Sequence, residues 1–187
     1  MNANLIHYMT SNSDDFQDFL DDTHCTDDDK LDAIIQIGTQ GWDECLEILV
    51  SRDDPLLQSQ QAAQAWVHMA SNGHTDCWMQ MLTTFYEAHA GNPDLWNDAL
   101  RVGRDDAAME GHWEVYALTK ALEGFVALKT PSDVAQMALL GMRIELMHGL
   151  DALTARRDVA DNFASKHIAQ VSTTKNVSNV FEGINFV

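Results

Sequence analysis

Apolar side chains recur along the chain at a helical spacing. In two stretches they follow a glycine at the same distance: Cys45, Leu46, Leu49 and Val50 after Gly41, and Cys77, Trp78, Met81 and Leu82 after Gly73. This spacing places the apolar side chains on one face of a helix. The pattern therefore predicts helices that each need a neighbour to cover an apolar stripe.

The same arrangement recurs at four marker glycines: Gly41, Gly73, Gly111 and Gly141. A tiny residue stands three positions before each glycine, at Gly38, Ala70, Ala108 and Ala138. A large apolar residue stands five positions after each, at Leu46, Trp78, Tyr116 and Leu146. Because glycine adopts the left-handed conformation that ends a helix, we expect four helix–turn–helix units with the tiny residues at close helix contacts.

Two of these turns resemble the ankyrin repeat. Residues 70–77 (Ala-Ser-Asn-Gly-His-Thr-Asp-Cys) and 107–115 (Ala-Ala-Met-Glu-Gly-His-Trp-Glu-Val) are similar to the middle of that repeat, where Ala-Ala-x-x-Gly-His joins two helices. The resemblance implies an all-α fold, a short α-solenoid of ankyrin-like repeats with helical caps. It also implies that His74 and His112 hydrogen-bond backbone at the inter-helix turn.

The chain departs from the ankyrin pattern in two respects. No unit carries the Thr-Pro-Leu-His sequence that opens the first helix of that family, and the marker glycines are 32, 38 and 30 residues apart. The connectors at 51–55, 90–94 and 129–133 resemble turns that lead into helix caps. Another solenoid of paired helices fits these features equally well.

We predict one repeat domain over residues 1–187. An acidic N-terminal cap spans 1–28 and includes a short helix over 14–21, about four helical pairs span 29–151, a last helix spans 152–171, and a tail spans 172–187. The stretch Thr26-Asp27-Asp28-Asp29 suits a helix start. Residues 180–187 are apolar, and we expect them to fold back on the terminal repeat; a docking peptide or a dimer contact are the alternatives.

The charge is strongly negative and unevenly distributed. The formal net charge is −18, and residues 1–100 hold 18 acidic residues against two basic ones, whereas residues 101–187 hold 11 against nine. Such a surface repels nucleic acid and anionic membranes and attracts proteins with basic patches. Since the N-terminus has no basic region or long apolar stretch, we expect a cytoplasmic protein without a membrane span.

Catalytic and metal-binding patterns are weak. His24-Cys25 beside Asp27, Asp28 and Asp29 lacks a second pair of metal ligands, and His112-Trp113-Glu114 lacks the cysteine pair of zinc deaminases. The three cysteines fit free thiols in a reducing compartment. We therefore expect a non-enzymatic protein that uses no metal or cofactor.

Acidic residues and two tryptophans near the turns are the candidate partner-binding residues. They are Asp14, Asp15, Asp18, Asp21, Asp22, Asp27, Asp28, Asp29, Trp42, Asp43, Glu44, Glu47 and Trp113. Trp66 and Trp78 are expected to be buried, and Trp42 and Trp113 to reach solvent.

Two functions account for these features. One is an adaptor that binds a basic protein, and the other is an inhibitor whose carboxylates imitate nucleic acid phosphates, as in acidic phage or mobile-element anti-defence proteins. The acidity also has a simpler explanation, which is solubility alone. The oligomeric state stays open.

Overall fold

The computed structural model describes residues 13–149 and 156–182, and every regular element within these ranges is helical. In chain order the elements are α2 (Ser13–Asp21), α3 (Asp27–Gln40), α4 (Asp43–Ser51), the 3-10 helix η1 (Pro55–Gln58), α5 (Gln60–Ser71), α6 (Thr75–Gln80), α7 (Leu82–Gly91), α8 (Pro93–Glu110), α9 (Trp113–Ala127), α10 (Ser132–Gly149) and α11 (Arg157–Glu182). The predicted all-helical fold is confirmed for this part of the chain.

Polar side chains explain where several helices begin. Oγ1 of Thr26 accepts a hydrogen bond from the backbone N–H of Asp29 (3.2 Å), and the Asp29 carboxylate accepts in return from the backbone N–H of Thr26 (3.1 Å). This reciprocal capping box begins α3 at the acidic stretch where a helix start was predicted. Helix α8 begins in a similar way, because the side chain of Asn92 accepts a hydrogen bond from the backbone N–H of Leu95. Pro93 follows as the first helical residue, where its missing N–H costs no helical hydrogen bond.

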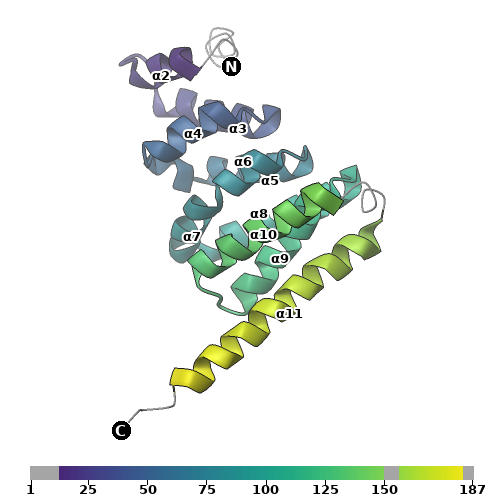
Figure 1. Ribbon diagram of the computed structural model, residues 1–187. Helices are drawn as coiled ribbons and strands as arrows, with labels where there is room; N and C mark the ends of the chain where they lie inside the picture. Colours follow the sequence, from purple (N-terminus) through teal and green to yellow (C-terminus); the bar gives the residue numbers. More distant parts are fainter. Residues whose placement is uncertain (1–12, 150–155, 183–187) are drawn as a thin grey trace.

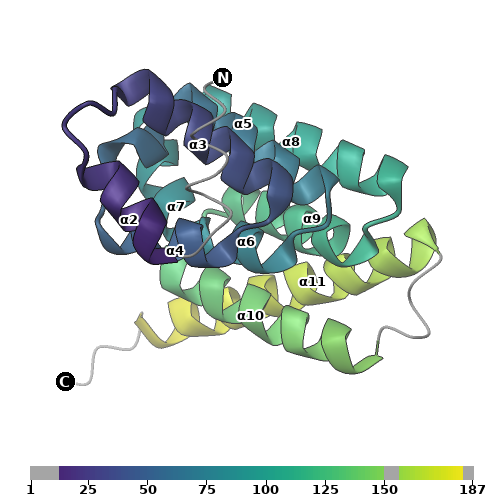
Figure 2. The same cartoon turned by 90° about the horizontal axis from the view of Figure 1, so that it is seen from above.

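The helices pack in two rows. Helices α3, α5 and α8 lie side by side in one row, and α4, α6 and α9 lie in the other (Figures 1 and 2). A tight turn joins each helix of the first row to its neighbour in the second, which gives the three helix pairs α3/α4, α5/α6 and α8/α9. Helix α2 packs on α4 at one end of the stack, and α10 and α11 pack on α9 at the other end.

A cluster of aromatic side chains fills the space between the second and third pairs. The ring of Trp66 stacks on that of Trp78 with centroids 5.2 Å apart, and it lies 4.9 Å from Phe85 and 5.9 Å from Trp96. Nε1 of Trp66 donates a hydrogen bond to the carbonyl oxygen of Trp78 (3.2 Å). All four side chains are buried, which confirms the predicted burial of Trp66 and Trp78.

Three of the four marker glycines lie at turns between paired helices. Gly41, Gly73 and Gly111 have φ values of 73°, 72° and 81°, in the left-handed region. The prediction for Gly141 is wrong, because this glycine lies inside α10, which runs without a break over Ser132–Gly149. A Cβ there would meet only open space, and a helix interior tolerates glycine at a cost of about 1 kcal/mol relative to alanine. Two long helices therefore follow the three pairs in place of a fourth pair.

Small residues allow the first-row helices to approach each other. A Cβ built on Gly38 would lie 2.4 Å from the carbonyl oxygen of Ala65, and one built on Gly103 would lie 3.0 Å from the Cβ of Ala70. The close contacts predicted for Gly38 and Ala70 are thus confirmed. They join successive pairs, however, instead of the two helices of one pair.

The other two small residues are less deeply placed. Ala108 and Ala138 are half-buried, whereas the adjacent Ala107 is completely buried. Since Gly141 does not begin a turn, Ala138 has no helix pair to bring together. The prediction of a close helix contact at the tiny residue therefore holds at Gly38 and Ala70 and fails at Ala138.

The two ends of the described chain differ in how well they were predicted. The short N-terminal helix is confirmed as α2, where Phe16 and Leu20 are buried and the rings of Phe16 and Phe19 stack at 6.0 Å. The last helix is longer than predicted, because α11 continues past residue 171 to Glu182. Residues 183–187, which make up most of the predicted apolar tail, lie outside the described residues.

Candidate interaction surface

The three turns between paired helices follow one another along one edge of the stack. We call residues 41–44, 73–76 and 111–114 the turn ridge. A Cβ built on Gly41 would lie 2.4 Å from Nδ1 of His74, and one built on Gly73 would lie 2.6 Å from Nδ1 of His112. The imidazole of each later turn thus occupies the space that a side chain on the preceding glycine would need, which fixes the turns against each other.

A hydrogen bond strengthens the first of these contacts. Nε2 of His74 donates to the carbonyl oxygen of Thr39, 3.1 Å away, at the end of α3. This confirms that His74 bonds to backbone, although the carbonyl belongs to the preceding unit. The His112 ring is half-buried against Gly73. Both rings therefore help to hold the units together.

Carboxylates begin the second-row helices on the turn ridge. Asp43 and Glu44 lie in the first turn of α4, Asp76 in that of α6 and Glu114 in that of α9, where the helix dipole favours negative charge. A polar hollow of about 340 Å³ between them is lined by Asp43, Asp76, Glu114 and Arg143 among others. Arg143 of α10 forms ion pairs with Asp76 and, through Nε at 3.4 Å, with Glu114. Within the described chain, no basic side chain lies within ion-pair distance of Asp43 or Glu44.

The partner-binding residues predicted from the sequence do not include Asp76, Glu114 or Arg143. A usable signal existed for the acids, because Glu44, Asp76 and Glu114 each follow a turn glycine by three residues. No local signal marks Arg143. It lies 67 and 29 residues from its two partners, and only the docking of α10 on the stack brings them together.

Three of the predicted partner-binding acids form hydrogen bonds or an ion pair within the fold. Hydrogen bonds from the side chain and backbone of Thr26 lower the pKa of Asp29 below its usual range. The backbone and ring of His24, each 2.9 Å from Oδ1 of Asp22, lower the pKa of that carboxyl group. Asp21 forms an ion pair with the arginine that follows α4. These acids stabilise the start of α3, the connection between α2 and α3, and the contact of α2 with α4.

Six other predicted acids form what we call the open acidic surface. They are Asp18, Asp27, Asp28, Asp43, Glu44 and Glu47, all exposed on α2, α3 and α4. Among the described residues, no basic side chain lies within ion-pair distance of any of them. Of the other two candidates, Asp15 is half-buried, and the side chain of Asp14 lies outside the described part of the chain. The structure thus brings six of the predicted acids to one end of the stack.

The two candidate tryptophans, Trp42 and Trp113, belong to the turn ridge. Trp42 is half-buried against the core, and Trp113 is half-buried with its ring edge-on to Tyr116 at 5.7 Å. Trp113 lines a small hollow of about 180 Å³ together with His112 and Glu114. Each ring therefore combines a packing role with some exposed surface beside the carboxylates.

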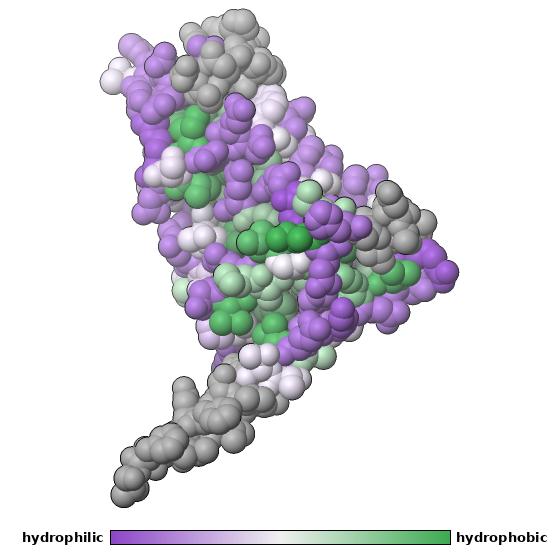
Figure 3. All heavy atoms as spheres, in the orientation of Figure 1, coloured by the Kyte–Doolittle hydropathy of each residue, from purple (hydrophilic) through white to green (hydrophobic). Residues whose placement is uncertain are grey.

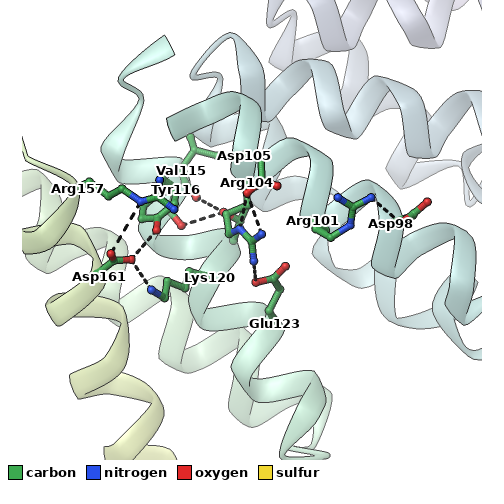
Figure 4. Close-up of polar contacts among 11 residues, drawn as sticks. Asp98, Arg101, Arg104, Asp105, Val115, Tyr116, Lys120, Glu123, Arg157 and Asp161 are labelled. Carbon is green, nitrogen blue, oxygen red and sulfur yellow. Dashed lines mark hydrogen bonds and ion pairs between the residues drawn. The ribbon is translucent and has the colours of Figure 1, made fainter. Parts of the chain in front are cut away.

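Charge is paired differently on α8–α11, as Figure 4 shows. Arg104 binds Asp105 at 2.8 Å and Glu123 at 2.5 Å, joining α8 to α9. The carboxylate of Asp161 on α11 accepts hydrogen bonds from Lys120 and from the hydroxyl of Tyr116. Burial by itself would raise the pKa of Asp161, but these hydrogen bonds outweigh burial and lower it. The carboxylates named here serve to join helices.

Burial disfavours ionisation of all three cysteine thiols. Burial raises the pKa of Cys45 and of Cys77 to about 11, so both thiols are protonated at neutral pH. Burial also raises the pKa of Cys25. Within residues 13–149 and 156–182, no group of three or more His, Cys, Asp or Glu side chains is arranged to hold a metal ion.

Comparison of this chain with protein-family models, with curated proteins and with solved structures gives no match. Over the ranges that the structure describes, no helix combines the length and apolarity that a membrane crossing requires. The case for a function therefore comes from the arrangement of the surface side chains.

Proposed function

We propose that this protein is a non-enzymatic interaction scaffold, an α-solenoid of divergent ankyrin-like repeats that binds a basic protein through the open acidic surface. The glycine turns and the stacking of His74 and His112 on the preceding turns support the repeat assignment. A stack of rigid helix pairs presents side chains from successive units on one continuous surface, as repeat proteins do when they bind partners.

The observation that carries this proposal is the absence of cations around the open acidic surface. Its six carboxylates lie on three successive helices and have no basic neighbour within ion-pair distance in the described chain. Like charges left together cost some stability and raise the rate of encounter with an oppositely charged partner. A lysine- or arginine-rich surface would neutralise them, and Trp42 beside Asp43 adds an aromatic contact.

Mimicry of nucleic acid is the special case in which the partner's basic surface is a nucleic-acid-binding groove. The same carboxylates would then compete with phosphates. Competition with duplex DNA distinguishes the two cases, because DNA displaces the protein from its partner only if the partner's basic surface also binds nucleic acid.

The test uses two immobilised variants with equal numbers of neutralised acids. The first, Asp28→Asn/Asp43→Asn/Glu47→Gln, changes the open acidic surface. The matched control, Glu87→Gln/Asp94→Asn/Glu110→Gln, changes exposed acids elsewhere. We expect a partner captured from cell extract by the wild-type protein to be lost from the first variant and kept by the control, and to dissociate as NaCl rises from about 0.1 to 0.5 M.

Partners that bind both variants equally at both salt concentrations would contradict the proposal. Among partners that meet the criterion, release by duplex DNA assigns nucleic acid mimicry, and retention assigns the general adaptor. A circular dichroism melt of each variant shows whether a loss of binding reflects a loss of fold.

A further inference from the structure

Helix α10 carries apolar side chains on two opposite faces. One face packs into the stack and holds Ala135, Leu139, Met142 and Leu146, each at most 2% exposed. The other face, which we call the α10 stripe, holds Val134 (43% exposed), Met137 (74%), Leu140 (51%), Ile144 (50%) and Met147 (63%). Figure 3 shows apolar side chains gathered over this part of the molecule. A helix that is apolar all round is normally covered on all sides, and contiguous exposed apolar surface marks an interaction site.

The spacing of the α10 stripe suits a second copy of the same helix. Met137, Leu140, Ile144 and Met147 are separated by three, four and three residues, the spacing of the apolar seam in paired helices. This sequence of intervals reads the same in both directions. A two-fold axis through the middle of α10 would therefore place Met137 against Met147 and Leu140 against Ile144 of the second copy, as a self-complementary interface requires.

Gly141 supports a close approach at this face. It is exposed in the middle of α10 beside Leu140 and Ile144, and a Cβ built on it would meet nothing within 4 Å. Glycine is less favourable than alanine in a helix interior, and no neighbour within the described chain requires it here. Against a second helix, its missing side chain lets the two backbones come together.

Polar side chains beside the stripe favour the antiparallel arrangement, because an imidazole can donate a hydrogen bond to a carboxylate. Asp133 is exposed at the start of α10, and His148 is exposed near its end. Antiparallel pairing brings Asp133 close to His148 of the second copy, whereas parallel pairing would bring the two Asp133 carboxylates together. Arg143 and Glu145 add little, because the first binds Asp76 and Glu114 and the second lies 3.4 Å from His167.

A groove enlarges the surface beyond one helix. It has a volume of about 590 Å³ and lies between α10 and the junction of α6 and α7, with Met79 and Leu82 on one side and Met137 and Leu140 on the other. A stable interface buries about 800 Å² on each partner. The stripe and the apolar groove wall together provide a surface that a second copy can cover.

We propose that the chain forms an isologous dimer in which the α10 stripes of two copies pack antiparallel. The stripe itself lies in the half of the chain that is close to neutral, residues 101–187. The two-fold axis of this contact lies in the interface plane and crosses the middle of α10 at about a right angle. This dimer does not depend on the proposed partner binding.

Sedimentation velocity of the 187-residue chain without any partner, at concentrations between about 1 and 100 µM, tests this dimer. We expect the wild-type protein to form a dimer, and Leu140→Asp to raise the dissociation constant at least about tenfold. The matched control is Met109→Asp, which changes a methionine that is 76% exposed on α8, away from the stripe, and leaves the dimer intact. Unchanged far-UV circular dichroism verifies that each variant is folded.

The direction of packing is tested by exchanging charges. Asp133→Lys is expected to weaken the dimer about two- to fivefold, and Asp133→Lys/His148→Glu to restore it. Since the contact is apolar, it persists in about 0.5 M NaCl. A wild-type protein that sediments as a monomer over the whole range, or equal weakening by Leu140→Asp and Met109→Asp, overturns the proposal. Failure of the double variant to restore the dimer overturns the antiparallel arrangement.

Discussion

Helices α2–α4 and helices α8–α11 differ in how far their acidic side chains are paired with basic ones. In α8–α11, Arg104, Lys120 and Arg143 each bind a carboxylate on a neighbouring helix. In α2–α4, the ion pair of Arg52 with Asp21 joins two helices, while the six acids of the open acidic surface have no basic neighbour in the described chain. Helices α8–α11 thus use several of their acids to join helices, whereas helices α2–α4 leave six acids exposed and without a basic neighbour in the described chain.

The difference shows that the acidity is not a requirement of the helix pair. The α3/α4 and α8/α9 pairs have the same kind of turn, with glycine in the left-handed conformation at Gly41 and Gly111. Burial of apolar side chains stabilises both pairs whether or not their carboxylates are matched. The unmatched acids of α2–α4 are therefore available for a partner. The predictions that follow test this contrast.

The largest expected effect is at the junction of the two regions. Trp66→Ala removes a buried ring that contacts Trp78, Phe85 and Trp96, and we expect it to lower the free energy of unfolding by about 3–5 kcal/mol. Trp113→Ala, at a half-buried site on the turn ridge, should cost clearly less. Urea titration followed by circular dichroism measures both. Equal losses would show that the aromatic cluster is not the main junction.

The turn glycines should differ between the two regions. Both Gly41→Ala and Gly111→Ala place a Cβ at a positive φ, which costs about 1 kcal/mol. At Gly41 the new Cβ also meets the His74 ring at 2.4 Å, whereas at Gly111 the nearest atom is 3.9 Å away. Displacing His74 loses packing and its hydrogen bond to Thr39, so we expect Gly41→Ala to cost about 2–3 kcal/mol in total.

Thermal unfolding of the two glycine variants under identical conditions measures this difference. A cost for Gly111→Ala as large as that for Gly41→Ala would mean that the histidine contacts do not hold the turn ridge together.

The third prediction concerns acid stability in the C-terminal region. The folded-state pKa of Asp161 is lowered, so its contribution is fully present well above pH 3.8 and is lost as the pH falls below that value. At pH 7, Asp161→Asn should cost about 1–2 kcal/mol, because hydrogen bonds from Lys120 and Tyr116 to a charged acceptor are lost. The gap between variant and wild type should close on acidification.

Asp18→Asn, at an exposed acid on α2, is the control for Asp161→Asn, and it should change stability at pH 7 by less than about 0.5 kcal/mol. Urea titrations at several pH values give both results. A gap for Asp161→Asn that stays constant down to low pH would refute the role of its charge.

The local parts of the fold were predictable from sequence, because they depend on residues close together in the chain. The capping stretch at Thr26, the apolar side of α2 and the turns at Gly41, Gly73 and Gly111 are examples. The turn predicted at Gly141 is wrong, although a tiny residue precedes this glycine by three positions as in the other units. An acidic residue stands three positions after the glycine in all three true turns, and a histidine follows the glycine directly in two of them. Gly141 has neither.

The parts that failed depend on contacts between distant segments. The pairing of Arg143 with Asp76 requires α10 to lie across the turn ridge, and no pattern within either segment specifies this. For the same reason the sequence did not separate acids that stabilise the fold, such as Asp21 and Asp29, from those that remain open. The structure brings most of the candidate acids to one end of the stack, but it uses three of them, Asp21, Asp22 and Asp29, within the fold.

The smallest expected effect gives the sharpest contrast, because one kind of substitution should change stability in opposite directions. Glu47 follows Asp43 by four residues and Glu44 by three on α4, so Glu47→Gln removes two repulsive pairs and should stabilise the protein by about 0.5 kcal/mol at low salt. Glu123→Gln breaks the ion pair with Arg104 and should destabilise by about 0.5–1 kcal/mol. Screening by 1 M NaCl should shrink both effects. Differential scanning calorimetry at low and high salt measures both signs. If Glu47→Gln also destabilises at low salt, the acids of α4 are held by interactions within the fold, and the distinction between the two regions fails.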